Sequence, residues 1–347
     1  MQKSVVDLRS DTVTRPTQAM REAMMGAEVG DDVLDHDPTT LQLEEKVASL
    51  LGKEKALFFP SGVQANQTAL AVHGRPGTEA VCEAGAHIFN YEEAAGAALS
   101  GLQLVPVRTP DGLLTPELVR AAIRPPSPYA PITALVEIEN THNSAGGKIL
   151  PQETARAIGD VARDAGLPVH LDGARLWHAS VATGRAPREL AEVADTVMVC
   201  MSKGLGAPVG SLLAGSEALM DRAWRVRRRL GGGMRQSGIL AAAGLYALEH
   251  NLARLAQDHD RARQLARGAG ELDGLSVETP DTNIVMLDIL RPGVTAEMLL
   301  NVLAEEGILM VPFGPTRIRA VTHMQVDEDG IRKAVEALAG SLARVKA

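Results

Sequence analysis

The sequence has few of the features that mark secreted or membrane proteins. It contains two cysteines, Cys82 and Cys200, and each lies in an apolar run, which favours a buried thiol over a disulfide or a metal ligand. No apolar stretch near the amino terminus is long enough for a signal peptide. The longest weakly charged window, residues 196–215, is interrupted by a lysine, a proline and four glycines. We therefore expect a cytoplasmic protein without a membrane span.

An excess of positive charge is also missing. The chain has 35 basic and 43 acidic residues, which gives a net charge of -8 at pH 7. A molecule of this sign repels phosphate polymers and anionic lipid surfaces, so neither nucleic acid nor a membrane is an expected partner. No internal repeat or low-complexity tract is present. The 347 residues, of which 45% are hydrophobic, are typical of about two ordinary globular domains.

Short β-rich runs alternate with amphipathic stretches between about residues 55 and 214. This alternation is typical of βα units on a mostly parallel sheet. The last two strands are separated only by the loop SKGLGAP, which is too short for a crossover helix, so they should pair antiparallel. The predicted strands are 56–59, 79–82, 103–107, 132–137, 168–172, 196–201 and 209–213.

The remaining residues are expected to form a smaller α+β unit. It would include helices over 216–229 and about 237–270, strands over 283–289 and 317–322, and helices over 295–306 and from 327 onward. We therefore predict an α/β protein whose large domain, residues 18–245, holds a mostly parallel seven-stranded sheet flanked by helices. Residues 1–17 and 246–347 would form the small domain.

Two predicted strands end in side chains that suit one cofactor. Asp172 ends the strand VHLD, and Arg175 follows three residues later. Lys203 follows the apolar strand VMVCMS, where an amine is costly unless it is neutral or covalently used. Taken alone, these residues could be a capping aspartate, a surface arginine and a lysine that reaches solvent. Together the amine and the carboxylate, at the strand ends where α/β sheets bind ligands, are the pair that pyridoxal phosphate requires.

A turn after the first strand of the large sheet could bind a phosphate. Residues 57–59 are followed by Pro60-Ser61-Gly62 and the start of a helix, whose free N–H groups attract anions. Any βα unit has such a turn, so alone it is weak evidence. It is neither a Walker loop nor a glycine-rich dinucleotide fingerprint, and this absence argues against a dinucleotide-binding enzyme.

Several longer words of the sequence resemble the L-threonine aldolases, pyridoxal-phosphate enzymes of fold type I, the aspartate-aminotransferase fold. They occur in the order of the family and extend over nearly the whole chain. The words are DLRSDTVTRP at 7–16, GDDV at 30–33, PSGVQAN at 60–66, ENTHN at 139–143, DGAR at 172–175, SKGLGAPVGSLL at 202–213, GGGMRQSGILAAAG at 231–244 and RAVTH at 319–323.

The resemblance implies roles for the residues near the cofactor ring. Lys203 would bind the aldehyde of the cofactor, Asp172 would pair with the ring nitrogen, and Arg175 would donate to the ring oxygen. His87 would stack on the ring, and His142 would lie near the β-hydroxyl of the substrate. The catalytic residues would then be Lys203, His142 and His87.

The resemblance also implies groups that bind the substrate and the phosphate. Ser10 and Arg319 would bind the substrate carboxylate, where a guanidinium offers a two-point fork. Val63 stands where the family usually has a threonine, and Leu34 stands where it has a tyrosine. The residues expected near the phosphate are Ser61, Gly62, Val63, Ser202 and, across a subunit interface, Arg235.

The implied activity is cleavage of L-threonine or L-allo-threonine to glycine and acetaldehyde. The implied assembly is a homo-oligomer, a tetramer built as a dimer of dimers, with active sites at subunit interfaces and no metal. Two alternatives stay open: another fold type I reaction, such as serine hydroxymethyl transfer or β-elimination, and a protein that binds the cofactor without catalysis.

A few residues are expected to have structural roles. Met24 and Met25 should belong to the core, and residues 225–229 (RVRRR) should form a solvated helix face or line the cofactor mouth. His178 and His259 are expected in helices, loops or the rim of the site.

Overall fold

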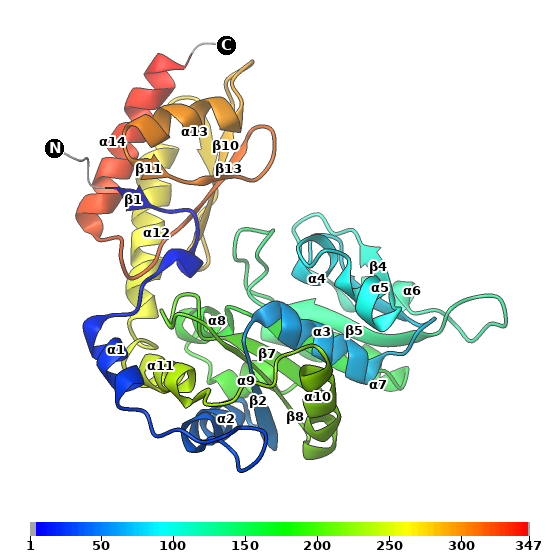
Figure 1. Cartoon of the computed structure of the whole chain (residues 1–347). Coiled ribbons are helices and arrows are strands. Elements are labelled where there is room, and N and C mark those ends of the chain that lie inside the picture. The colour runs from blue at the N-terminus through cyan, green and yellow to red at the C-terminus, as the bar shows by residue number, and fades with distance from the viewer. Residues whose placement is uncertain (1–4, 346–347) are drawn as a thin grey trace.

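The computed structural model describes residues 5–345, which form two units, each with its own hydrophobic core (Figure 1). Residues 1–4, part of the expected small-domain segment, and residues 346–347 lie outside the described residues. Within residues 5–345, no helix combines the length and the apolar character that crossing a membrane requires.

The larger unit contains a seven-stranded sheet, as predicted. β8 pairs antiparallel with both β7 and β2, which confirms the expectation for the last two strands, whereas the other neighbouring strands are parallel. The strands, in their order across the sheet, are β2 (Lys55–Phe59), β8 (Ser211–Gly215), β7 (Thr196–Cys200), β6 (Val169–Gly173), β5 (Thr133–Glu139), β3 (Glu79–Glu83) and β4 (Gln103–Val107).

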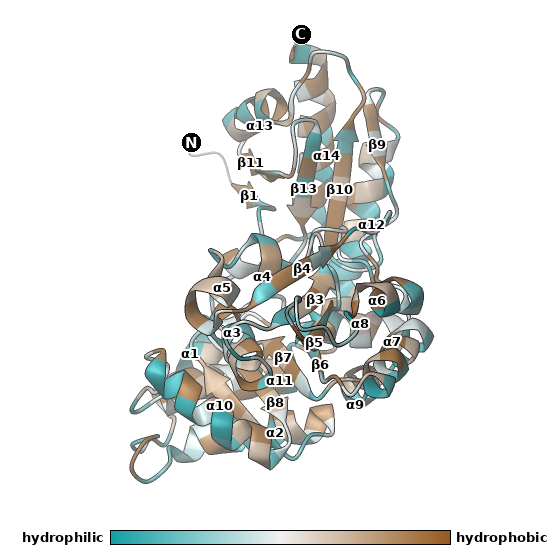
Figure 2. Ribbon diagram, turned by 90° about the vertical axis from the view of Figure 1, so that its right-hand side faces the viewer, coloured by the Kyte–Doolittle hydropathy of each residue, from teal (hydrophilic) through white to brown (hydrophobic). Residues whose placement is uncertain are grey.

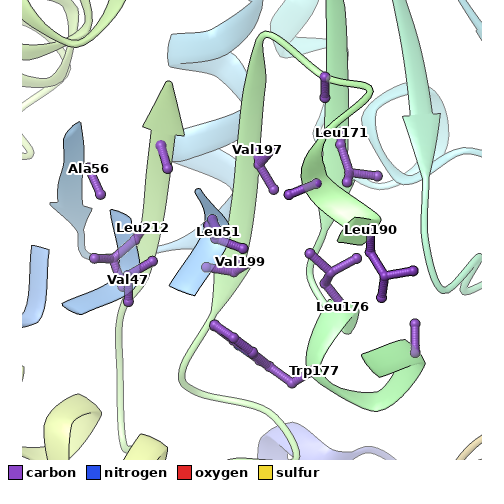
Figure 3. Packing of buried hydrophobic residues seen from close by; sticks show 14 of the residues in the cluster. Val47, Leu51, Ala56, Leu171, Leu176, Trp177, Leu190, Val197, Val199 and Leu212 are labelled. Carbon is purple, nitrogen blue, oxygen red and sulfur yellow. The ribbon is translucent and has the colours of Figure 1, made fainter. Parts of the chain in front are cut away.

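Helices cover both faces of this sheet because its central strands are apolar on both sides. In β7, Val197 and Val199 face one core, and Met198 and Cys200 face the other, as the two-residue period of a strand requires. Figure 3 shows the first core, where Trp177 packs with these valines. The strands of the sheet are mostly brown in Figure 2, whereas the covering helices carry hydrophilic residues.

The helices of the larger unit begin and end where local signals place them. The helix at 116 begins after the capping Thr115, whose side chain accepts from the Leu118 N–H, and Pro116 occupies its first turn, as expected. The other helices are η1 (Asp11–Val13, a 3-10 helix), α1 (Gln18–Met25), α2 (Pro38–Leu51), α3 (Gly62–His73), α4 (His87–Asn90), α5 (Ala95–Ser100), α6 (Pro116–Ala122), α7 (Gln152–Asp164), α8 (Leu176–Thr183), α9 (Pro187–Ala191), α10 (Glu217–Arg229) and α11 (Gly238–His250).

The smaller unit joins the two ends of the described chain. β1 (Val6–Asp7) pairs with β11 (Ile308–Leu309), so the first residues lie beside the last elements (Figure 1). A four-stranded antiparallel sheet packs against three helices. These elements are β12 (Val311–Pro312), β13 (Arg317–Val321), β10 (Ile284–Ile289), β9 (Leu275–Val277), α12 (Leu255–Gly270), α13 (Ala296–Glu305) and α14 (Glu328–Arg344). The domain boundaries after residues 17 and 245 stay predictions.

Some structural expectations were wrong. The helix expected over 237–270 is broken into α11 and α12, and Asn251, in the turn between them, donates to the Leu205 carbonyl 2.8 Å away. Met25 is 83% exposed and is not part of the core. Arg227 is buried, where it donates to Asp32 and to the Phe58 carbonyl, because burying its charge requires partners.

Two histidines expected in helices, loops or at the rim lie on helices but in the interior. His178 and His259, on α8 and α12, are both buried, and His178 Nδ1 lies 2.9 Å from His259 Nε2. Burial lowers the pKa of both side chains, which therefore pack as neutral rings at the contact between the two units.

Candidate active site

A cavity of about 230 Å³ lies at the carboxyl ends of β2, β5, β6 and β7. This is the edge where open α/β sheets bind ligands. Most of the residues predicted near the cofactor line it, and the structure therefore brings them together: Lys203, Asp172, His87, Ser61, Gly62, Val63 and Ser202. Arg175, Arg235, Ser10, Arg319 and His142 are not among its lining residues.

Lys203 lies in the loop that joins β7 to β8. Its amine has no hydrogen-bond or ion-pair partner within residues 5–345, although the residue lies in the cavity wall. The Gly206 N–H donates to the Lys203 carbonyl and closes a tight turn that fixes the backbone of the lysine. An amine without a partner beside a cavity is available for covalent binding of an aldehyde.

Asp172 ends β6 on the same side of the cavity and is 1% exposed. Its Oδ1 accepts from the Ala174 N–H at 3.0 Å, and its Oδ2 accepts from Asn66 Nδ2 at 2.7 Å. Two donors therefore hold a buried carboxylate in one orientation toward the cavity, which is the arrangement that a partner for a ring N–H needs.

Glu92 organises the network beside His87, and sequence reasoning missed it. Glu92 Oε1 lies 2.8 Å from His87 Nδ1 and accepts from Asn66 Nδ2 at 2.9 Å, and its Oε2 accepts from Gln67 Nε2 at 2.6 Å. Burial lowers the pKa of His87, but the hydrogen bond with Glu92 and the charge of Asp172 outweigh it, so the pKa is raised. The imidazole is therefore fixed in place over the cavity.

The same carboxylates raise the question of a metal. His87, Glu92 and Asp172 each place one ligand atom within 4.8 Å of the others. His87 and Glu92 already share a hydrogen bond, and Asn66 bridges Glu92 to Asp172. We therefore assign the three groups to one hydrogen-bond network. That the site binds no metal stays a prediction.

The amino terminus of α3 supplies backbone donors to the cavity. Ser61 caps the helix by accepting from the Gln64 N–H at 3.2 Å. The first residue must be small, because a Cβ at Gly62 would lie 3.1 Å from Cys200 Sγ. Val63 is 37% exposed and offers no hydroxyl, so the free N–H groups of the first turn are the anion donors here.

Arg175 is occupied by a partner that the sequence did not predict. Its Nε and Nη2 donate to the two carboxylate oxygens of Asp11, both at 2.8 Å, and its Nη1 donates to Asn143 Oδ1 at 3.3 Å. Burial tends to raise the pKa of Asp11, but the charge of Arg175 and its hydrogen bonds lower it well below its ordinary value. This fully buried pair ties η1 to the loop after β6.

We predict that replacing Asp11 with asparagine destabilises the protein by about 3–5 kcal/mol, because the Arg175 charge is left buried without a counter-charge. Since folding lowers the pKa of Asp11, its contribution is complete above about pH 4 and is lost as the pH falls further. Denaturant unfolding of the wild type and the variant at pH 7 and pH 3 measures this. The gap should narrow at pH 3, and an equal gap at both values would contradict the assignment. Asp260→Asn, in an exposed ion pair with Arg263, is the control.

Arg319 lies close to Arg175 on the side of the smaller unit. Its Nη1 donates to Asn143 Oδ1 at 2.9 Å, so one amide oxygen joins the two guanidinium groups. The guanidinium carbon lies 5.2 Å from the centre of the Phe313 ring, which holds the fork flat. Ser10 caps η1 by accepting from the Thr12 N–H at 3.2 Å.

Two predicted residues lie away from the cavity that holds Lys203. His142 lines an adjoining cavity of about 280 Å³; its Nε2 lies 3.1 Å from Glu83 Oε2, and its Nδ1 accepts from the Ala145 N–H at 3.2 Å. Arg235 is half exposed and pairs with Asp31 at 3.0 Å. Within one chain, therefore, neither side chain reaches the cavity.

The arrangement of sheet, helices and cavity defines a class of protein. A threonine aldolase from Leishmania major superposes with a TM-score of 0.81 at 22% identity, over 96% of this chain and 98% of that one. At this identity the likeness shows the fold, which is fold type I of the pyridoxal-phosphate enzymes.

Sequence comparison narrows the class further. The family model for β-eliminating lyases matches residues 7–291. Low-specificity L-threonine aldolase 1 from Arabidopsis thaliana is 45% identical over 328 residues, 92% of each chain. The low specificity L-threonine aldolase of Escherichia coli (strain K12) is 42% identical over 341 residues, 98% of this chain and all of the relative (100%). The chain belongs to the β-eliminating lyase family and, within it, to the threonine aldolases.

Proposed function

We propose that this protein is a pyridoxal-phosphate-dependent L-threonine aldolase, which cleaves L-threonine and L-allo-threonine to glycine and acetaldehyde. The observation that carries the proposal is the placement of the Lys203 amine and the Asp172 carboxylate in one cavity, at the ends of the neighbouring strands β6 and β7. The names of the related aldolases from Arabidopsis thaliana and Escherichia coli support it.

The residues of the cavity fit pyridoxal phosphate. Lys203 has a free amine for the aldehyde, Asp172 is a held carboxylate for the ring nitrogen, and the first turn of α3 offers N–H groups to the phosphate. Ser61 and Ser202 lie in the cavity wall near that turn and add hydroxyl donors. When bound, the cofactor accepts the electron pair that is released as the Cα–Cβ bond of the substrate breaks.

The protein side chains orient the ring and exclude water. Asp172 favours a protonated ring nitrogen, which strengthens electron withdrawal. His87, held by Glu92, covers the cavity and packs against the ring face. The apolar Met198 lines the opposite wall and keeps the electrostatic contacts in a medium of low polarity.

The substrate carboxylate is expected beside Arg319. The guanidinium is anchored by Asn143 and Phe313, and it presents a fork that binds a carboxylate at two points. Ser10 adds a hydroxyl from the same side. Fixing the carboxylate fixes rotation about the Cα–N bond, and this selects the Cα–Cβ bond for cleavage.

The base that removes the β-hydroxyl proton is His142 or a bound water. Both nitrogens of His142 have neighbours, because the Ala145 N–H occupies Nδ1 and Glu83 faces Nε2. A ring without a free lone pair directed into the cavity is better suited to hold a water than to take the proton itself. We therefore favour the water as the base, with His142 as a residue that positions it.

We predict that His142→Phe lowers kcat by less than about tenfold, because direct loss of a general base costs about 10²–10⁴-fold. Steady-state cleavage of L-threonine and L-allo-threonine at saturating cofactor measures this. A loss of 100-fold or more would return the base role to the imidazole itself. Phe89→Leu, on the neighbouring α4, is a control for a change of ring packing.

One assay separates this activity from its alternatives. The purified protein is given L-threonine, L-allo-threonine or serine, with and without added pyridoxal phosphate, and the products are identified. Glycine and acetaldehyde that depend on the cofactor support the aldolase. Dependence on folate indicates serine hydroxymethyl transfer, ammonia with a keto acid indicates β-elimination, and cofactor uptake without turnover indicates a binding protein.

We further propose a cytoplasmic homo-oligomer, a tetramer, in which Arg235 reaches the phosphate in a neighbouring subunit. Arg235 is half exposed beside Asp31, on the surface of one chain, where a second copy could take it as a partner. Cys82 and Cys200 are buried and unpaired, in keeping with a reducing compartment. Light scattering of the purified protein measures the assembly.

A further inference from the structure

A chain of hydrogen-bonded side chains leads from Asp172 through the larger unit, away from the cofactor cavity. Asp172 Oδ2 lies 2.7 Å from Asn66 Nδ2, and Asn66 Oδ1 lies 3.1 Å from His170 Nε2. His170 Nδ1 lies 3.0 Å from Thr196 Oγ1, which lies 2.9 Å from His73 Nε2. Asn66, His170 and Thr196 are fully buried, so these contacts are not shared with bulk solvent.

The chain ends at a second cavity, on the opposite edge of the sheet. His73, at the carboxyl end of α3, lies in the wall of a cavity of about 870 Å³ at the amino ends of β3 and β5. Helix α3 lies along the sheet between the two cavities and supplies both Asn66 and His73 (Figure 1). The relay, defined here as Asn66, His170, Thr196 and His73, therefore connects the two edges of the sheet.

The donors and acceptors of the relay have one consistent orientation. An ionised Asp172 accepts only, so Asn66 must turn its amide N–H groups toward Asp172 and Glu92, and its oxygen toward His170. His170 then donates from Nε2. Burial lowers its pKa to about 4, so the ring is neutral and its Nδ1 accepts from the Thr196 hydroxyl.

The orientation extends to the outer end. The Thr196 hydrogen is used on His170, so its oxygen must accept from His73 Nε2. Burial lowers the pKa of His73 to about 3, and the repulsion of His170 and Arg222 adds to this, so His73 is also neutral. Every N–H and O–H of the relay therefore points toward Asp172.

Asp172 needs such support because other carboxylates surround it. Glu92, Glu137 and Glu139 lie near it, and Glu137 is fully buried with neither oxygen hydrogen-bonded within residues 5–345. Like charges oppose the ionisation of one another, and burial adds to the cost. Aligned dipoles that end on Asp172 favour its ionised form and strengthen one another along the chain.

We propose that His170, Thr196 and His73 are positioning residues for Asp172, which hold it as the ionised partner of the cofactor ring from the far edge of the sheet. This inference rests on the proposed pyridoxal-phosphate function. No proton needs to move along the relay, because the amide of Asn66 fixes the polarity without carrying a proton.

Thr196 offers a matched pair of variants. Thr196→Val keeps the shape of the side chain and removes the hydroxyl, whereas Thr196→Ser keeps the hydroxyl. Equilibrium dialysis of the holoenzyme against falling cofactor concentrations measures the Kd for pyridoxal phosphate. We expect valine to weaken binding about three- to tenfold, the range of one ordinary hydrogen bond, and serine to restore it. In the valine variant kcat should fall while KM for L-threonine stays unchanged, because the relay does not touch the substrate.

A second pair tests the outer end of the relay. His73→Leu should weaken cofactor binding in the same direction as Thr196→Val, whereas Arg75→Leu should not change it. Arg75 lies in the wall of the same cavity, and its guanidinium has no hydrogen-bond partner within residues 5–345. Equal effects of the two leucine variants would overturn the proposal, because they would reflect a change of the cavity surface alone.

The tautomers provide a readout that does not depend on activity. In ¹⁵N-histidine NMR spectra of the holoenzyme, His73 and His170 should both be neutral with the proton on Nε2. Thr196→Val should shift the His170 Nδ1 resonance, because that nitrogen loses its donor. A proton on Nδ1 of His170, or native cofactor affinity in the valine variant, would overturn the relay while leaving the proposed function intact. A wild-type protein that does not bind pyridoxal phosphate would overturn both.

Discussion

Replacing Lys203 with alanine should abolish cleavage of L-threonine, with a loss of about 10³-fold or more in kcat, the scale seen when a covalent catalytic group is removed. The reason is that Lys203 supplies the only lysine amine in the wall of the cavity that the described residues form. Turnover measured with excess pyridoxal phosphate tests this directly.

Lys55→Ala is the matched control. Lys55 begins β2 in the same sheet, is partly exposed, and forms an ion pair with Asp221 on the surface. Its loss should leave kcat near the wild-type value, since exposed ion pairs contribute little. Near-normal turnover in the Lys203 variant, with the control also active, would contradict the covalent role.

The second large effect is expected at Asp172. Asp172→Asn keeps the size of the side chain and removes its charge, so the ring nitrogen loses the group that favours its protonation. We expect kcat to fall on the order of 10³-fold, comparable to the loss of a transition-state charge contact, with little change in KM. The absorption spectrum of the bound cofactor should shift as well.

Asp160→Asn serves as the control for Asp172→Asn. Asp160 lies on α7, exposed beside Arg163, and is far from the cavity wall. A kcat within about fivefold of the wild type in the Asp172 variant would show that the carboxylate does not act on the ring, since groups that stabilise developing charge contribute more than this.

The larger sheet was predictable because its strands are short apolar runs between turn signals. β7 and β8 are joined by a loop too short for a crossover, and the length of that loop alone requires them to pair antiparallel. By contrast, β11 and β12 are two residues long, and no two-residue period can be recognised in so short a segment.

The break between α11 and α12 could not be predicted from local pattern. Residues 237–270 have nearly continuous helical character, and no proline interrupts them. The chain turns where Asn251 donates to the Leu205 carbonyl, 46 residues away in sequence, so a tertiary contact overrides local propensity.

The cavity residues were predictable where chemistry coincides with a strand end. Lys203 and Asp172 interrupt apolar runs, and this places them at one edge of the sheet. Asp11 and Glu92 were missed because their partners lie elsewhere in the chain: Asp11 meets Arg175 across 164 residues. The adjacent amides Asn66 and Gln67, early in an otherwise apolar helix, were the signal for a polar network under α3.

The central claim is that Lys203 binds pyridoxal phosphate covalently. Borohydride reduction of the wild-type holoenzyme, followed by peptide mass mapping, tests it most directly. The account predicts one reduced pyridoxyl adduct per chain, on the peptide that contains Lys203. An adduct on any other lysine, or no adduct in a protein that is saturated with the cofactor, would contradict it.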